Sequence, residues 1–325
     1  MNCADAYQNY TCLQRLPGAR LADPRSVQPA VLPTGRAGEH DSAMIRIDAH
    51  QHFWKYSATE YGWIDESMAV LKRDFLPGDL APLLDANGLD GSIAVQARQS
   101  LEETRWLLDL AQVNGRIKGV VGWADLCSAE LPEQLNEFSK SKKLVGVRHV
   151  VQAEPDDGFM LRPEFRRGIA QLAAFDLVYD LLLFPRHLPA AVQLVREFPE
   201  QAFVLDHIAK PSIADGVLEP WRGAIRELAQ FPQVSCKLSG MVTEARWQKW
   251  SYEDFVPYLD VVFEAFGPAR LMIGSDWPVC TVSADYARTL GIVEKYIEQF
   301  STGERDAILG GNCARVYQVT SEGKL

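Results

Sequence analysis

The chain has 325 residues, 47% of them hydrophobic, which is enough for one large core and fits a barrel that folds as a single domain. Its formal net charge of -10 argues against a nucleic-acid partner, because phosphate binding needs a basic face. No apolar run approaches the roughly 20 residues that span a bilayer, and six scattered cysteines without a CxxC pair favour free thiols, so we predict no membrane partner and a cytoplasmic location.

Residues 1–43 differ from the rest of the chain. They are rich in Pro, Gly, Ala and Arg, show no sustained hydrophobic period, and lack the continuous apolar core of a secretory signal. We interpret them as a flexible N-terminal tail that precedes a barrel over residues 44–325. Met44 stands directly before IRIDAH and is an alternative start, which makes the tail a start-site artefact under this hypothesis.

From residue 45 onward, short apolar runs alternate with helical patterns. The predicted strands cover residues 45–50, 92–96, 118–123, 145–149, 178–182, 202–207, 234–238 and 271–275. Helical spacing covers residues 101–114, 163–174, 188–198, 252–266, 286–300 and 302–316. This alternation predicts an α/β protein with a parallel sheet closed into a (β/α)8 TIM-type barrel. An open doubly wound sheet is the alternative, although no glycine-rich phosphate loop follows the first strand.

Histidines and a carboxylate stand at the ends of three predicted strands. The first strand ends in His50 and His52, and a period of two places both side chains on one face. His207 and Asp276 end two other strands, where barrel enzymes carry their active sites. Three imidazoles and one carboxylate suit one Zn²⁺-like divalent ion, so these four residues are the predicted metal ligands. The structural alternative is that His50 and His52 form a hydrogen-bonded pair, that Asp206 and His207 pair with the backbone, and that Asp276 caps a helix.

Further polar side chains at the strand ends are candidates for substrate binding. Strict alternation lets only one of Arg148 and His149 face the barrel centre. Asp180 lies within an apolar strand and needs a partner there, because an unpaired buried charge is costly. Gln96 ends the second predicted strand, and Trp54 belongs to an aromatic run that we expect to form a loop wall over the site.

Lys237 lies in the seventh predicted strand, within CKLSG. It is expected either to face the site or to pair with an acid, and the sequence does not decide between the two.

Several stretches together resemble the amidohydrolase superfamily. They are DAHQHFW, GVRHVVQAEPD, FVLDHIAKP, CKLSGMVTEA and LMIGSDWPVC, in that order. More narrowly, they are similar to the amidohydrolase-2 branch, which contains sugar-acid lactonases of the L-fuconolactonase and L-rhamnonolactonase type. The late GGNCARVYQV is similar to the closing helix of that branch. The match runs from about residue 45 to residue 319 and implies a (β/α)8 barrel that hydrolyses a lactone.

The resemblance also implies roles for the matching residues. Asp276 corresponds to the strand-8 aspartate that activates water and His207 to the strand-6 histidine, and these two are the predicted catalytic residues. Dinuclear members of the superfamily carry a bridging Lys or Glu after the fourth strand and a metal-binding His at the fifth. Here these places hold Arg148, His149 and Asp180, which argues against two metal ions. One ion or metal-independent catalysis remains, with His50 and His52 as ligands or as donors to the oxyanion.

The sequence therefore predicts an enzyme that hydrolyses a cyclic ester. Its partner is a small-molecule sugar-acid lactone similar to L-fuconolactone, the product is the open aldonic acid, and homo-oligomer formation is left open. A metal-dependent non-oxidative decarboxylase on the same barrel is the alternative function, since related sites support both reactions. A barrel that only binds a ligand is the second alternative, which the cluster of ionisable groups at the strand ends disfavours.

Overall fold

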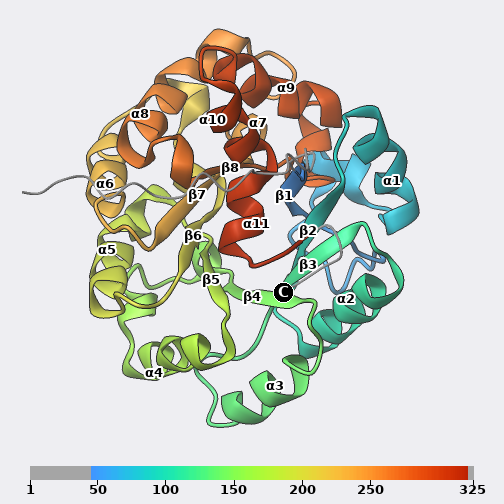
Figure 1. Cartoon of the computed structure of the whole chain (residues 1–325), viewed down its shortest axis with the longest axis vertical. Helices are drawn as coiled ribbons and strands as arrows, with labels where there is room; N and C mark the ends of the chain where they lie inside the picture. Colours follow the sequence, from blue (N-terminus) through green and yellow to red (C-terminus); the bar gives the residue numbers. More distant parts are fainter. Residues whose placement is uncertain (1–44, 321–325) are drawn as a thin grey trace, which may run out of the picture. The chain divides into compact units, whose positions relative to one another are not determined.

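The structure is a computed structural model that describes residues 45–320. The predicted tail at residues 1–43 lies outside the described residues. Eight parallel strands follow one another in sequence order around one sheet (Figure 1). They are β1 Ile47–Gln51, β2 Gly91–Val95, β3 Ile117–Gly122, β4 Leu144–His149, β5 Val178–Leu181, β6 Phe203–Leu205, β7 Val234–Leu238 and β8 Leu271–Ile273.

The sheet closes between its first and last strands, just beyond their carboxyl ends. The backbone N–H of Asp276 donates to the carbonyl of His50 over 2.8 Å, and the N–H of His52 donates to the carbonyl of Trp277 over 2.7 Å. The prediction of a single-domain (β/α)8 barrel is confirmed, and the open doubly wound sheet is wrong. Strands β6 and β8 end earlier than expected, because the chain turns out of the sheet before His207 and Asp276.

Helices lie between the strands and surround the barrel (Figure 1). They are α1 Pro77–Ala86, α2 Leu101–Val113, α3 Leu131–Phe138, α4 Pro163–Leu172, α5 Leu188–Glu197, α6 Trp221–Leu228, α7 Met241–Glu244, α8 Val256–Phe266, α9 Tyr286–Ile297, α10 Thr302–Asp306 and α11 Asn312–Val316. The single helix expected over residues 302–316 is interrupted by a π-helical segment, Ala307–Gly311. None of the helices among residues 45–320 is long and apolar enough to cross a bilayer.

The strands are buried along their whole length, which is typical of a parallel sheet covered on both faces. The helix starts follow simple chemistry. Ser100 accepts the N–H of Glu103 at the start of α2, and prolines occupy the first turn of α4, α5 and α8, where a missing N–H costs nothing. Near the C-terminal end of the described chain, α11 packs Cys313 into a cluster of strand side chains.

One close contact fixes how α4 sits in the fold. Gly168 lies in this helix, and a β-carbon built there would meet the carbonyl oxygen of Leu126 at 2.2 Å. Backbone cannot move aside as a flexible side chain can. Any larger residue at this position therefore forces α4 away from the segment that follows β3.

Replacing Gly168 with Ala is expected to lower the free energy of unfolding by about 1–3 kcal/mol, the usual cost of overpacking. Gly291→Ala in α9 is the matched control, since nothing lies within 4 Å of its built β-carbon. The control should be neutral or stabilising by up to about 1 kcal/mol, because Ala favours a helix more than Gly. Urea unfolding followed by circular dichroism measures both. Equal stability of the two variants would contradict the predicted clash.

Candidate functional site

A cavity of about 560 Å³ opens at the carboxyl ends of the strands. Its walls come from the segments that follow β1, β2, β4, β5, β6 and β8, the mouth at which barrel enzymes bind their ligands. It is lined by His52, Glu60, Trp63, Ala97, Arg98, Gln99, Ser100, Arg148, Val150, Gln152, Ala153, Leu182, His207, Lys210, Asp276 and Val279.

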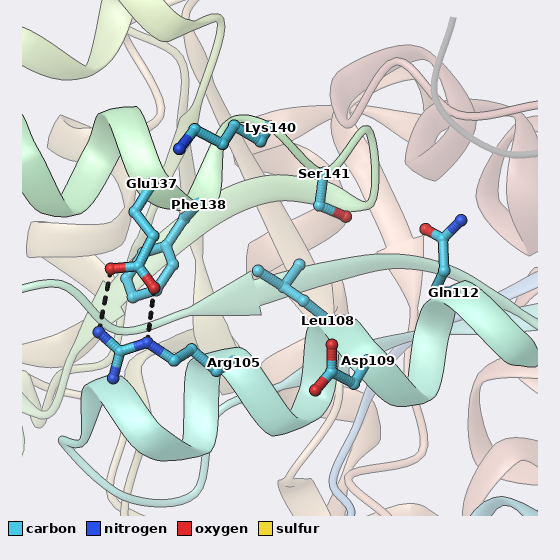
Figure 2. Close-up of a pocket in the computed structure, with 8 residues that line it drawn as sticks. All are labelled: Arg105, Leu108, Asp109, Gln112, Glu137, Phe138, Lys140 and Ser141. Carbon is cyan, nitrogen blue, oxygen red and sulfur yellow. Dashed lines mark hydrogen bonds and ion pairs between the residues drawn. The ribbon is translucent and has the colours of Figure 1, made fainter.

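A second hollow, of about 310 Å³, lies on the outer surface between α2 and α3 (Figure 2). Arg105 and Glu137 form an ion pair with two hydrogen bonds across it, and Leu108 and Phe138 supply its apolar lining. Its lining residues include no histidine and no buried cluster of ionisable groups. This outer hollow therefore lacks the groups for chemistry that the barrel mouth holds.

The closing seam of the barrel brings His50, His52 and Asp276 together. The Nε2 atoms of His50 and His52 lie 3.2 Å apart. The Oδ1 atom of Asp276 lies 3.4 Å from Nε2 of His52 and 3.9 Å from Nε2 of His50. All three side chains are buried. The predicted pairing of the two histidines with Asp276 is thus present in the structure.

His207 reaches the same point through an unusual turn. Residues 207–210 all have positive φ angles, between 49° and 59°, a region that side-chain-bearing residues rarely occupy. The turn places Nε2 of His207 3.9 Å from Oδ1 of Asp276, and its Nδ1 2.8 Å from the hydroxyl of Ser239. Gly240 is required beside it, since a β-carbon there would lie 2.5 Å from Nδ1 of His207.

Burial controls the charge of these groups. It lowers the pKa of His207 to about 4 and holds the pKa of His50 well below its ordinary value, so both rings are neutral at neutral pH. Burial acts to raise the pKa of Asp276, but attraction to His207 and the hydrogen bond with His52 outweigh it and lower the pKa. The result is a carboxylate facing neutral imidazoles. The carbonyl oxygen of Val95 lies 2.7 Å from Nδ1 of His52 and accepts a hydrogen bond from it.

The side chains of His50, His52 and Asp276 fit one divalent ion, and His207 lies beside Asp276. Ligand atoms bound tetrahedrally to zinc lie about 3.3–3.6 Å from one another. The Nε2 atoms of His50 and His52 lie 3.2 Å apart, and Oδ1 of Asp276 lies 3.4–3.9 Å from Nε2 of each of the three histidines. Neutral imidazoles and a carboxylate are also the donor set that zinc prefers. These residues are therefore suited to hold one ion.

A fully buried network of charges supports the site. Nζ of Lys237 lies 2.5 Å from Oδ2 of Asp180 and 3.0 Å from Oδ1 of Asp206. Arg148 donates to Oδ2 of Asp206 over 2.9 Å, and Oδ1 of Asp206 lies 3.3 Å from Nδ1 of His50. Despite burial, Lys237, His50 and Arg148 hold the pKa of Asp206 well below its usual range. Carboxylates and cations at this depth stay charged only because each has a partner.

Asp180 and Lys237 belong to this network and do not line the cavity. The hydroxyl of Tyr317 donates to Asp180 from the far side over 2.8 Å, and Asp180 is fully buried. The expected contact between Asp180 and substrate is thus corrected, because the side chain of Asp180 is buried within the barrel and does not reach the cavity. Of the two alternatives for Lys237, the structure selects pairing with acids.

Of Arg148 and His149, only Arg148 has a side chain that faces the cavity. Arg148 lines the cavity, while the ring of His149 stacks on Phe159 at 4.8 Å and its Nε2 lies 2.7 Å from Glu154. The expected substrate contact of His149 is therefore corrected, because the alternation of β4 turns its side chain toward the helices. Gln96 is fully buried and donates to the backbone carbonyl of Arg148 over 3.1 Å, so it supports Arg148 instead of lining the cavity.

The aromatic wall is present, but its exposed member is Trp63. Trp54 is fully buried, donates from Nε1 to the carbonyl of Arg73, and packs edge-on against Trp63 and Phe75. Trp63 is 42% exposed and lines the cavity. The expected contact between Trp54 and substrate is therefore corrected. Trp54 instead supports Trp63, which lines the cavity.

Glu60 and Lys210 line the cavity and were not among the predicted site residues. Lys210 stands in the FVLDHIAKP stretch, three residues after His207, and that position is the signal that could have found it. Glu60 lies in a long loop between β1 and α1, where no sequence period predicts which side chains turn inward.

Glu103 does not line the cavity, but its hydrogen bonds link the segment after β2 to the loop after β1, and both of these line it. Its buried carboxylate accepts the backbone N–H groups of Ala97 and Arg98 over 3.0 and 2.8 Å. The hydroxyl of Tyr61, in the loop that carries Glu60 and Trp63, donates to the same carboxylate over 3.3 Å. Burial raises the pKa of Glu103 to about 7, although these hydrogen bonds and the charge of Arg98 act against the rise.

Comparison with known proteins gives consistent matches over the barrel. The family described as amidohydrolase matches residues 47–319. L-fucono-1,5-lactonase from Burkholderia multivorans is 46% identical, with 84% of this chain and 96% of the relative covered. L-fucono-1,5-lactonase from Burkholderia ambifaria is 38% identical, with 85% and 96% covered. A solved amidohydrolase from Burkholderia multivorans with bound zinc is 46% identical, with a TM-score of 0.82 over 85% of this chain and 100% of its own.

More distant structures share only the barrel. A 5-carboxyvanillate decarboxylase from Sphingomonas paucimobilis is 13% identical, with a TM-score of 0.59 over 86% of this chain and 100% of its own. At this identity the likeness shows the fold alone, so it does not favour the decarboxylase alternative.

Stability is expected to depend on the protonation of Glu103. The raised pKa means that the folded state keeps this proton after the unfolded state has lost it, so the contribution of Glu103 to stability falls as the pH rises from about 4.5 to about 7. Relative to Glu103→Gln, the wild-type protein should lose about 2 kcal/mol of unfolding free energy between pH 5.5 and pH 8. Urea unfolding at both pH values measures this difference. A difference between the two proteins that does not change with pH would contradict it.

Proposed function

The chain belongs to the amidohydrolase family, and we propose that it is a hydrolase that opens sugar-acid lactones. The substrate is L-fucono-1,5-lactone or a close stereoisomer, and the product is the open aldonic acid. One observation carries the proposal: the carboxylate of Asp276 lies within 3.9 Å of three imidazole nitrogens, beside a cavity of about 560 Å³. The two curated relatives named L-fucono-1,5-lactonase support this choice of substrate.

Asp276 is the general base of the proposed reaction. Its lowered pKa keeps it ionised, so it accepts a proton from a water molecule in the cavity while the water oxygen attacks the lactone carbonyl carbon. The bond between that carbon and the ring oxygen then breaks, and Asp276 returns the proton to the ring oxygen. The acid that forms releases its own proton to the solvent at neutral pH, which makes turnover measurable.

Positively charged and neutral donors stabilise the charge that develops on the carbonyl oxygen. Arg148 is held rigidly by Asp206 and by the backbone of Gln96, so it can face a substrate oxygen without losing further conformational freedom. His50, His52, His207 and Asp276 would hold a divalent ion. When bound there, such an ion supplies Lewis-acid polarisation of an oxygen atom.

Substituting Asn for Asp276 should reduce kcat about 10²–10⁴-fold, because the amide cannot accept the proton from water. Binding of the corresponding uncharged alditol, measured by calorimetry, should persist. Asp109→Asn, on the exposed surface of α2 near the outer hollow of Figure 2, is the matched control and should leave kcat unchanged. Turnover is followed as acid release with a pH indicator. Near-normal turnover in Asp276→Asn would exclude the general-base role.

Removal of a metal ion gives a separate test of the four-residue ligand group. After dialysis against a strong chelator, one equivalent of added Zn²⁺ should bind and raise the melting temperature, and His52→Ala should weaken that binding at least about tenfold. Elemental analysis and thermal unfolding measure this independently of turnover. Full activity in protein confirmed to be free of metal would assign the histidines to substrate and oxyanion contacts, as the metal-independent alternative requires.

A further inference from the structure

The cavity is lined by three cationic side chains, and each of them already has a carboxylate partner. Arg98, Arg148 and Lys210 come from the ends of β2, β4 and β6. Cations in a concave site normally favour anionic ligands, because low-dielectric walls strengthen attraction to an opposite charge. Whether these three cations act in that way depends on what surrounds each one.

Arg98 is paired on two sides. Its Nη1 donates to a carboxylate oxygen of Glu60 at the cavity wall, and its Nε lies 3.7 Å from a carboxylate oxygen of buried Glu103. The guanidinium also stands 5.4 Å from the centre of the Tyr61 ring. Arg98 thus faces two carboxylates and an aromatic ring before any ligand arrives.

The other two cations are paired as well. Arg148 donates to Asp206 over 2.9 Å, and Lys210 lies 3.6 Å from a carboxylate oxygen of Glu244 at the C-terminal end of α7. Lys210 is mostly buried, and its side chain is 16% exposed. Asp276 adds a further carboxylate to the same cavity.

Each of the three cations that line the cavity therefore already has a carboxylate partner, and the ion pairs of Asp276 within the described chain are with histidines. A lactone that carries a carboxylate of its own would have to compete with Glu60 or Glu244 for a cation, and it would also approach Asp276. An uncharged lactone meets no such repulsion. Its hydroxyl groups can donate to a carboxylate and accept from the paired cation without separating the two.

We propose that Glu60 and Glu244 determine the charge selectivity of this site, which admits uncharged, hydroxyl-bearing lactones and rejects lactones that carry a carboxylate. This inference rests on the proposed lactonase function. It identifies Glu60 and Glu244 as specificity-determining residues that act through Arg98 and Lys210, and it assigns them no part in the chemical step.

The test compares kcat/KM for an uncharged aldonolactone and an aldarolactone, whose terminal carbon is a carboxylate. Both are assayed at pH 8 and low ionic strength, after subtraction of spontaneous hydrolysis. The variants are Glu60→Gln and Glu244→Gln, which keep the size of the side chain and remove its charge. Glu137→Gln is the matched control, because it breaks a comparable Arg–Glu pair on the outer surface (Figure 2).

The wild-type enzyme should prefer the uncharged lactone by at least about 100-fold, the ratio expected when a ligand carboxylate enters a partly buried site whose cations already have carboxylate partners. Each of the two variants should raise the ratio of aldarolactone to aldonolactone turnover about three- to tenfold, with the smaller change at Glu60, which is 48% exposed and better screened. Glu137→Gln should leave the ratio unchanged.

Two results would overturn the inference and leave the lactonase function intact: a wild-type preference for the aldarolactone, or ratios in both variants equal to that of the control. Absence of turnover on either lactone would instead overturn the proposed function. Calorimetric binding of an uncharged alditol and of the aldarate dianion, in the wild-type protein and both variants, then decides the charge preference without catalysis.

Discussion

The arrangement of the site depends on two backbone hydrogen bonds that close the barrel. They join the segment after β8 to the end of β1 and fix the main chain of His50, His52 and Asp276. The carboxylate of Asp48 secures the same seam, since it accepts the backbone N–H groups of His50 and Ser275 over 3.1 and 2.9 Å. Three of the four candidate ligands therefore take their positions from the contact that makes the sheet a closed barrel. The site cannot loosen without opening the fold.

The charges below the site provide a second level of support. His50 connects these buried charges to the ligand group, because its Nδ1 faces Asp206 and its Nε2 faces Asp276. A carboxylate beside one ring nitrogen fixes the orientation of an imidazole and increases its basicity at the other. Lys237 keeps Asp206 ionised, and Asp180 with Tyr317 balances Lys237 in turn. A buried network of this kind contributes little net stability, so its value lies in holding one geometry.

The sequence was sufficient for the barrel and for the proximity of His50, His52 and Asp276, and physical reasons limit the rest. Strand periodicity and the spacing of His50 and His52 are local patterns, so they could be read directly. The depth of Asp180 depends on where β5 meets its neighbours, and no local pattern states this. His207 reaches the site because residues 207–210 all adopt positive φ angles, and no sequence pattern predicts this conformation. The partner of Arg98 comes from a loop 38 residues away, so only the folded chain reveals the pair.

The two kinds of residue in this site also differ in where the fold places them. The groups proposed for chemistry stand on the seam and at the strand ends, where the whole barrel fixes them. The groups proposed for selectivity stand on the loop after β1 and on the short helix after β7. Loops can change without disturbing the sheet that carries them. A barrel built in this way can therefore keep one hydrolytic centre and alter the charge of the lactone that it accepts. Exchanging single carboxylates beside the cavity's cations would suffice, because those cations are already in place.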